Sequence, residues 1–159
     1  YHKIPLSYQT HCFFKRKDNL WTYQGEEDLL NRNIIIYRDH SYGEILKNYL
    51  AKKDMSKLIL TYDDTYLDKS IKSINTNRAD AFLFTVNSVT HHLLINNIQG
   101  ISQDKCIKKD TLWMPFSHKK KELHIKAIAF LDNALKDFVK TDKYNAILKR
   151  YHIRFPALN

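Results

Sequence analysis

Two turns of this chain combine hydroxyl, amide and basic side chains, which are the groups that bind small anions and polar solutes. Each turn follows a short apolar segment and precedes a helical pattern. The residues concerned are Arg38, His40, Ser41, Tyr42, Thr85 and Asn87. The first backbone N–H groups of a helix have no partner within it, so they can bind an anion. The turns therefore predict a site for a small anionic or polar ligand, such as an amino acid carboxylate.

A plainer structural interpretation exists for each of these turn residues. Ser41 and Glu44 have the spacing of a capping box, which by itself explains a helix start. A capping residue can also contact a ligand, so the two interpretations of Ser41 are compatible. For Arg38 and His40 an ordinary surface position is favoured over a direct role in the site.

No arrangement of residues in the sequence indicates an enzyme or a metal centre. A Ser/His/Asp set, a Cys/His pair or a carboxylate dyad does not stand out. His91 and His92 are adjacent, and neighbouring side chains on a helix point about 100° apart, so they cannot easily share one metal. Only three glycines are present, which excludes GxGxxG and Walker-type phosphate loops. We expect no enzymatic activity, no metal and no cofactor.

The charge of the chain suggests an acidic partner. Its 26 basic and 17 acidic side chains give a net charge of +9. The lysines are scattered, and the one dense run, at 118–121, opens a predicted helix, so we expect no nucleic-acid partner. A basic, solvated surface explains the charge as well. No apolar stretch of membrane-spanning length and no signal peptide is visible in the sequence, so we expect at most a peripheral association with a membrane.

Cys12 and Cys106 are the two cysteines of the chain. Their separation rules out a CxxC redox or zinc motif. They form either one disulfide in an oxidising compartment or two buried thiols.

The elements that position the turns alternate between strand and helix. Apolar runs predict strands at Asn33–Tyr37, Lys57–Tyr62 and Ala79–Thr85, and helical periodicity predicts helices at about 42–53, 65–75 and 87–96. This alternation is typical of a parallel sheet flanked by helices, in which ligands bind at the carboxyl ends of the strands. Asp80, at the start of a strand and far from that edge, is predicted to be structural.

Further elements are predicted on either side of this repeat. They are a strand at Thr10–Lys17, a short helix at Glu26–Leu30, a weak strand at Asp104–Lys108, a stronger strand at Leu112–Phe116, and helices at Lys120–Lys140 and Lys143–Tyr151. Pro115 places the strand at Leu112–Phe116 at an edge or a crossing point.

Six motifs between about Tyr8 and Tyr151 resemble, in the same order, those of the bacterial periplasmic solute-binding proteins of family 3, which have the type 2 periplasmic-binding-protein fold and serve polar amino acid importers. The most specific is Asn77–Phe82 (NRADAF), which is similar to the family's GRVDAV. The others are His11–Asp18, Tyr23–Leu29, Tyr37–Glu44 (YRDHSYGE), Leu112–His118 and Tyr144–Tyr151. Each motif alone is weak, and the resemblance depends on their common order.

The resemblance implies an α/β fold with one complete three-layer lobe, plus C-terminal helices that belong to a largely missing first lobe. Residues 1–17 would be the crossing strand from lobe 1, residues 18–111 lobe 2, and residues 112–159 the return strand and the C-terminal helices. A disulfide between Cys12 and Cys106 would tie the crossing strand to lobe 2, provided that the protein is periplasmic.

The function implied by the resemblance is non-enzymatic binding of a small polar solute in a cleft between two lobes. The expected protein is a periplasmic monomer that closes by hinge motion and presents its ligand to an ABC transporter permease. The turn at Ser41 and Tyr42 would contact the ligand. Phe14 would line the hinge side of the cleft, although an aromatic residue on a strand is more often part of the core.

One position departs from the family pattern. Many members place an aspartate at or beside Thr85, where it pairs with the ligand ammonium, whereas residues 84–87 here carry no carboxylate. A neutral threonine cannot neutralise a buried ammonium. The sequence therefore predicts a ligand without an amino group, a ligand with other chemistry, or no ligand.

Three other classes of protein share this type of fold. A sensor or receptor module would be fused to a signalling domain in the full gene. The effector domain of a cytoplasmic regulator would have free thiols and a preceding helix-turn-helix. A domain appended to an enzyme would need a further catalytic domain.

Overall fold

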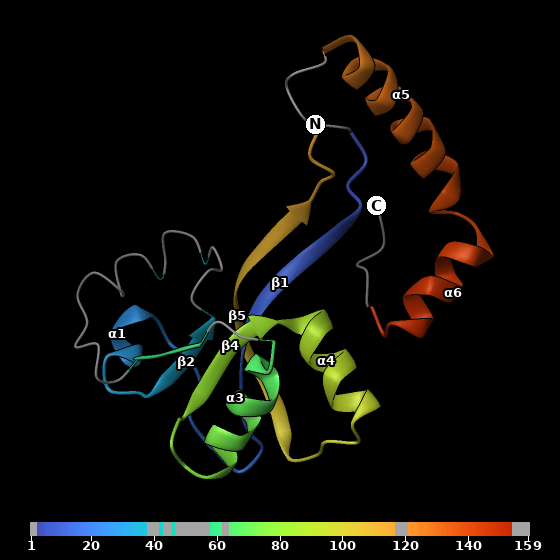
Figure 1. Ribbon diagram of the computed structural model, residues 1–159. Coiled ribbons are helices and arrows are strands. Elements are labelled where there is room, and N and C mark those ends of the chain that lie inside the picture. Colours follow the sequence, from blue (N-terminus) through green and yellow to red (C-terminus); the bar gives the residue numbers. More distant parts are fainter. Residues whose placement is uncertain are drawn as a thin grey trace. The chain divides into compact units, whose positions relative to one another are not determined.

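The structure is a computed structural model that describes residues 3–37, 42, 46, 58–61, 64–116 and 121–153. The chain divides into two compact units, Thr10–Lys109 and a second one made of Tyr1–Gln9 with Asp110–Asn159. We call the first the sheet unit and the second the helical unit. Figure 1 shows the elements of both. The predicted assignment of residues 1–17, 18–111 and 112–159 to two lobes stays a prediction.

The sheet unit is built on five strands in the order β3-β2-β4-β1-β5. Their bounds are β1 Ser7–Arg16, β2 Ile34–Tyr37, β3 Leu58–Thr61, β4 Ala81–Thr85 and β5 Ile101–Leu112. Strand β2 is parallel to both β3 and β4, while β1 is antiparallel to β4. The three parallel strands β3, β2 and β4, in this spatial order, confirm the sheet predicted from the alternation of strands and helices.

Two apolar layers cover the faces of this sheet. Ile34 and Ile36 pack with Leu29 of α1 (Glu26–Leu29) on one face. Ile35 packs with residues of α3 (Tyr66–Asn75) and α4 (Val86–Ile95) on the other. Successive side chains of a strand point to opposite faces, and the strand is apolar without alternation because both faces are covered. The three-layer α/β class predicted from the sequence is therefore confirmed.

The helical unit contains α5 (Lys121–Phe138) and α6 (Asp142–Arg150). The Thr141 side chain caps α6 by accepting a hydrogen bond from the Tyr144 backbone N–H at 3.2 Å. Asp132 of α5 accepts the backbone N–H groups of Lys3 and Ile4 at 2.6 and 3.1 Å. Among the described residues, no helix has both the length and the apolar character needed to cross a membrane.

One part of the predicted element order is wrong. The separate strands expected at Asp104–Lys108 and Leu112–Phe116 are replaced by the single strand β5, Ile101–Leu112, and residues 113–116 are in no strand. Strand β5 is an edge strand of the sheet and pairs with the long strand β1. Many of its residues are polar, so the hydrogen bonds to β1 rather than hydrophobicity keep them in the strand. The predicted helix at 42–53 lies almost entirely outside the described residues.

Candidate functional site

The carboxyl ends of three parallel strands form one edge of the sheet unit. The ends are Tyr37 of β2, Thr61 of β3 and Thr85 of β4. Helix α3 begins at Tyr66, shortly after β3, and α4 begins at Val86, directly after β4. Because parallel strands end at the same edge, the N-termini of both helices lie there as well. This edge is the candidate site.

Thr85 lies at this edge in the position expected from the sequence. It is the N-cap residue of α4, its side chain is buried, and its hydroxyl donates to the Ser88 hydroxyl at 2.8 Å. Asn87 follows in the first turn of α4 and is half-buried. The start of α4 therefore offers neutral hydroxyl and amide groups together with backbone N–H groups.

The Tyr42 side chain closes the end of β2. It is buried in the core, and its hydroxyl accepts the Tyr37 backbone N–H at 2.9 Å and donates to the Tyr37 carbonyl at 3.1 Å. Burial raises the pKa of the Tyr42 hydroxyl well above its ordinary value, an effect that its backbone hydrogen bond only partly opposes. The hydroxyl is thus a neutral structural group, and contact with a ligand through Tyr42 would have to come from its backbone.

Three predicted site residues lie outside the described part of the chain, namely Arg38, His40 and Ser41. Their predicted roles stay predictions. The structure describes their neighbours Tyr37 and Tyr42 on either side.

Phe14 is not brought together with the other predicted site residues. It is 3% exposed, pairs with Phe82 across β1 and β4, and stacks on that ring at a centroid distance of 5.3 Å. The register places this pair three positions along β4 from Thr85. The position corresponds to the core alternative that the sequence left open.

Two residues at the candidate edge were missed by the sequence reasoning. His11 of β1 pairs with Thr85, is 3% exposed, and meets the Tyr42 ring edge-on at 5.5 Å. The Tyr66 hydroxyl lies 3.0 Å from the Leu83 carbonyl oxygen and 3.3 Å from that of Ile35, so it fastens the start of α3 across two strands. Burial raises the pKa of Tyr66 well above its ordinary value. Only the strand register reveals the position of His11.

Asp80 and His92 both make contacts within the sheet unit. Asp80 is structural, as predicted, because it accepts the Asn33 backbone N–H at 2.8 Å at the start of β4. The Nε2 atom of His92 lies 3.1 Å from a carboxylate oxygen of Asp68, and this contact joins α4 to α3. In the described part of the chain, no group of three or more metal-ligating side chains comes together.

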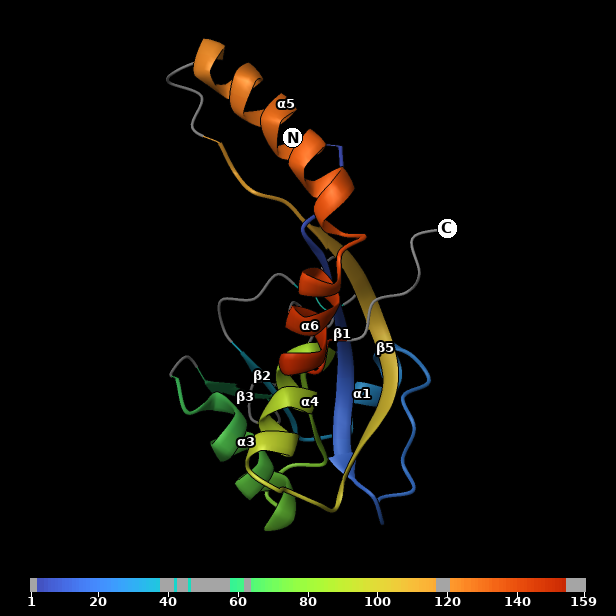
Figure 2. The same cartoon turned by 90° about the vertical axis from the view of Figure 1, so that its right-hand side faces the viewer.

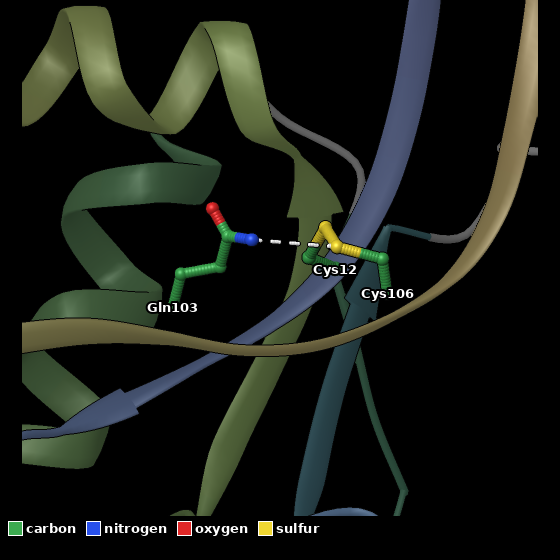
Figure 3. Close-up of a disulfide and its surroundings, with 3 residues drawn as sticks. All are labelled: Cys12, Gln103 and Cys106. Atoms are coloured by element: carbon green, nitrogen blue, oxygen red, sulfur yellow. Dashed lines mark hydrogen bonds between the residues drawn. A yellow bond between two sulfur atoms is a disulfide. The ribbon is translucent and has the colours of Figure 1, made fainter.

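Cys12 and Cys106 are joined in a disulfide. The sequence left this pairing open between one disulfide and two thiols. Figure 3 shows the bond between β1 and β5, with the Gln103 amide donating to the Cys106 sulfur at 3.4 Å.

Comparisons with known proteins identify the fold. No family model and no curated protein matches this sequence. Among solved structures, a mutant of ArgBP from T. maritima matches with a TM-score of 0.67 at 14% identity, over 97% of this chain and 62% of that protein. The chain has the type 2 periplasmic-binding-protein fold. AbpA from Streptococcus pneumoniae, an amino acid ABC transporter substrate-binding protein bound to L-arginine, matches with a TM-score of 0.65 at 17% identity, over 98% of this chain and 63% of that protein.

A third solved structure with this fold is a histidine kinase sensor domain with similarity to periplasmic binding proteins. It matches with a TM-score of 0.61 at 20% identity, over 94% of this chain and 61% of that domain. In each of these comparisons the chain spans about three fifths of the length of the protein that it matches. The type 2 fold is therefore present in part.

Proposed function

We propose that this chain binds a small polar or anionic solute, without chemistry on it, as part of a type 2 binding protein of an ABC importer. The observation that carries the proposal is the meeting of the α3 and α4 N-termini at one edge of the sheet. Helix N-termini present unpaired backbone N–H groups and a partial positive charge, which together favour an anion. The net charge of +9 favours the same class of ligand.

The start of α4 bears on the class of ligand. Residues 84–88 carry no carboxylate, and Thr85 contributes a hydroxyl that is already paired with Ser88. An ammonium placed here would lose its hydration without gaining a counter-charge from this segment. We therefore infer that the site prefers a carboxylate or another small anion to an α-amino acid bound through its ammonium.

Isothermal titration calorimetry of the purified protein tests this proposal. The probes are L-arginine and the 2-oxo acid with the same side chain, after native mass spectrometry has shown whether a small molecule is already bound. We expect the 2-oxo acid to bind more tightly than the amino acid. Absence of binding to every small anion and amino acid of a broader panel, by protein with an intact circular dichroism spectrum, would contradict solute binding.

Two variants sharpen the test. Thr85→Asp keeps a good helix N-cap and supplies a carboxylate, so it should shift the preference toward the amino acid. Asn87→Ala removes an amide from the first turn of α4 and should weaken binding of both probes. Lys72→Ala, on the exposed surface of α3, is the control and should change neither affinity.

The remaining parts of the proposal concern the whole protein. We propose that residues 1–17 are the crossing strand from lobe 1, that residues 18–111 form lobe 2, and that residues 112–159 are the return strand and the C-terminal helices that pack on lobe 1. We also propose that the protein is a periplasmic monomer with a hinge between the lobes. Leu123 and Phe130 of α5 are 60% and 76% exposed and, being seven residues apart, lie on one face of the helix. They support this assignment because they offer an apolar surface for further lobe 1 structure.

A second candidate function is ligand sensing by a receptor. The similarity to a histidine kinase sensor domain favours it. The two functions share the candidate site and differ in the partner, so the sequence of the complete gene distinguishes them. A signalling domain fused to this chain would favour sensing, and a neighbouring gene for a permease would favour transport.

A further inference from the structure

Two strands carry the chain between its two compact units. One unit boundary falls between Gln9 and Thr10 within β1, and the other between Lys109 and Asp110 within β5. Strands β1 and β5 are neighbours in the sheet and lie side by side in Figure 2. Any change in the orientation of the units must therefore twist or bend this pair of strands.

The two strands are antiparallel. The backbone N–H of Leu6 donates to the Leu112 carbonyl at 3.0 Å at one end, and that of Lys17 donates to the Gly100 carbonyl at 2.8 Å at the other. Hydrogen bonds alone allow such a pair to shift in register when the outer strand pairs on one side only. Among the strands that the structure describes, β5 is an edge strand and pairs only with β1.

The disulfide crosslinks this pair close to the unit boundaries. Cys12 lies two residues inside the first boundary and Cys106 three residues inside the second. A covalent bond at this place prevents any shift of β5 along β1. It forces the two strands to twist and bend together.

The two sulfurs differ in their surroundings. Cys12 is fully buried among Phe14, Phe82 and other core residues, whereas Cys106 is exposed on the edge strand. A thiolate must reach the sulfur that it attacks, so Cys106 is the accessible one. The Gln103 amide beside it also offers a hydrogen bond to this sulfur.

We propose that Cys106 is a thiol–disulfide exchange site through which a dithiol reductant opens the link between β1 and β5 and frees the two connecting strands to move separately. The thiolate of the dithiol bonds to the Cys106 sulfur, the bond between the two cysteines breaks, and the electron pair leaves on Cys12, which takes up a proton. The second thiol of the reductant then releases Cys106 as a thiol and leaves as part of an intramolecular disulfide. This proposal does not depend on the identity of the solute.

Hydrogen–deuterium exchange of the full chain, before and after reduction with dithiothreitol, tests whether the disulfide restrains β1 and β5. We expect exchange to rise about tenfold or more in β1 and β5, and by less than about twofold in β2 and β4, because opening is local. An equal rise in all strands would show that the bond only adds global stability, and no rise would show that it does not restrain the strands. Either result would overturn the proposal.

The double variant Cys12→Ala/Cys106→Ala is the control for the reductant. Its β1 and β5 exchange should match that of the reduced protein and should not respond to dithiothreitol. Should this variant fail to fold, the comparison of oxidised and reduced wild-type protein still decides.

Glutathione tests which sulfur is attacked, because this monothiol remains bonded to that sulfur as a mixed disulfide. After a brief reaction and an acid quench, peptide mapping should find glutathione on Cys106 in about tenfold excess over Cys12. Equal labelling of the two cysteines, or labelling mainly on Cys12, would contradict the assignment of Cys106 as the site of attack.

Discussion

The two units of this chain bury their apolar residues to different extents. In the sheet unit, Phe13, Phe82 and Leu83 are fully buried. In the helical unit, Leu123 and Phe130 are 60% and 76% exposed, and no residue of α6 is buried. A domain is stabilised mainly by apolar area removed from water. The sheet unit thus has a core of its own, whereas the helical unit has apolar surface left for another layer of structure.

The two units also differ in what they offer to a binding partner. The candidate site lies at the edge of the sheet unit, where a rigid core can hold Thr85 and the helix N-termini in place. The helical unit contributes long helices with an apolar surface, which is the property that an interface requires.

Replacing a phenylalanine by alanine should destabilise the protein far more in the sheet unit than in the helical unit. Phe82→Ala in the sheet unit should lower the free energy of unfolding by about 3–5 kcal/mol, because it leaves a cavity in a packed core. Phe130→Ala in the helical unit should change it by less than about 0.5 kcal/mol. Urea unfolding followed by circular dichroism measures both. Similar losses would remove the contrast between the units.

Two aspartates that accept backbone N–H groups give a second test. Asp104 accepts the Tyr23 N–H at 2.8 Å and lies 3.6 Å from the Lys15 ammonium, with both side chains at most 10% exposed. Asp104→Asn leaves Lys15 buried without its counter-charge and should lower the free energy of unfolding by about 3 kcal/mol.

The matched variant in the helical unit is Asp132→Asn. It weakens two hydrogen bonds to the backbone of Lys3 and Ile4 near the surface, so the expected loss is about 1 kcal/mol or less. Chemical denaturation of both variants under identical conditions gives the comparison. A larger loss of stability for Asp132→Asn than for Asp104→Asn would contradict the expectation that polar contacts of the sheet unit contribute more to stability than those of the helical unit.

At alkaline pH the free energy of unfolding should fall mainly because of buried tyrosines in the sheet unit. Burial raises the pKa of Tyr66 above its ordinary value of 10.0, so the native state keeps a proton that the unfolded state loses. This contribution to stability is complete below pH 10 and is lost as the pH rises toward the native pKa, by about 1.4 kcal/mol per pH unit for each such group. Tyr42 acts in the same direction.

Tyr66→Phe should therefore flatten the fall in the free energy of unfolding between pH 10 and pH 11.5. Tyr151→Phe, which removes a phenol hydroxyl from an exposed position of the helical unit, is the control for the loss of a hydroxyl as such. Urea unfolding at a series of pH values measures the slopes. If the free energy of unfolding of Tyr66→Phe falls with pH as steeply as that of the wild type, the buried hydroxyl does not cause the loss of stability at alkaline pH.

The smallest effect concerns the exposed apolar surface itself. Phe130→Gln should change the free energy of unfolding by less than about 0.5 kcal/mol but reduce the binding of a hydrophobic dye. Leu20→Gln, at a 94% exposed position in a loop of the sheet unit, is the control and should leave dye binding unchanged. Equal reductions would mean that α5 presents no continuous apolar surface.

Local patterns in the sequence predicted most elements of the sheet unit. Strands β2 and β4 are short runs with hardly any polar residue, so they are recognisable without knowledge of their neighbours. Strand β5 was misread because its residues Ser102–Lys105 are polar and the strand is held by pairing with β1. An edge strand needs little apolar character, so hydrophobicity marks it poorly.

The candidate site was predicted less completely. The position of Thr85 at the end of a strand and the start of a helix follows from the local pattern around it. For Phe14 the sequence left open a place at the hinge side of the cleft and a place in the core, and the register pairs it with the fully buried Phe82. His11 was overlooked because its pairing with Thr85 is invisible in the sequence.

The sequence by itself determined the strands β2 and β4, the helices α3 and α4, and the absence of a carboxylate at the start of α4. These features depend on residues near one another in the chain, where apolar periodicity and helix capping act. Only the tertiary structure decided that β1 inserts between β4 and β5, which pairs His11 with Thr85 and joins Cys12 to Cys106 across 94 positions. Such pairings depend on strand register, and register is set by the packing of the whole sheet rather than by any local pattern.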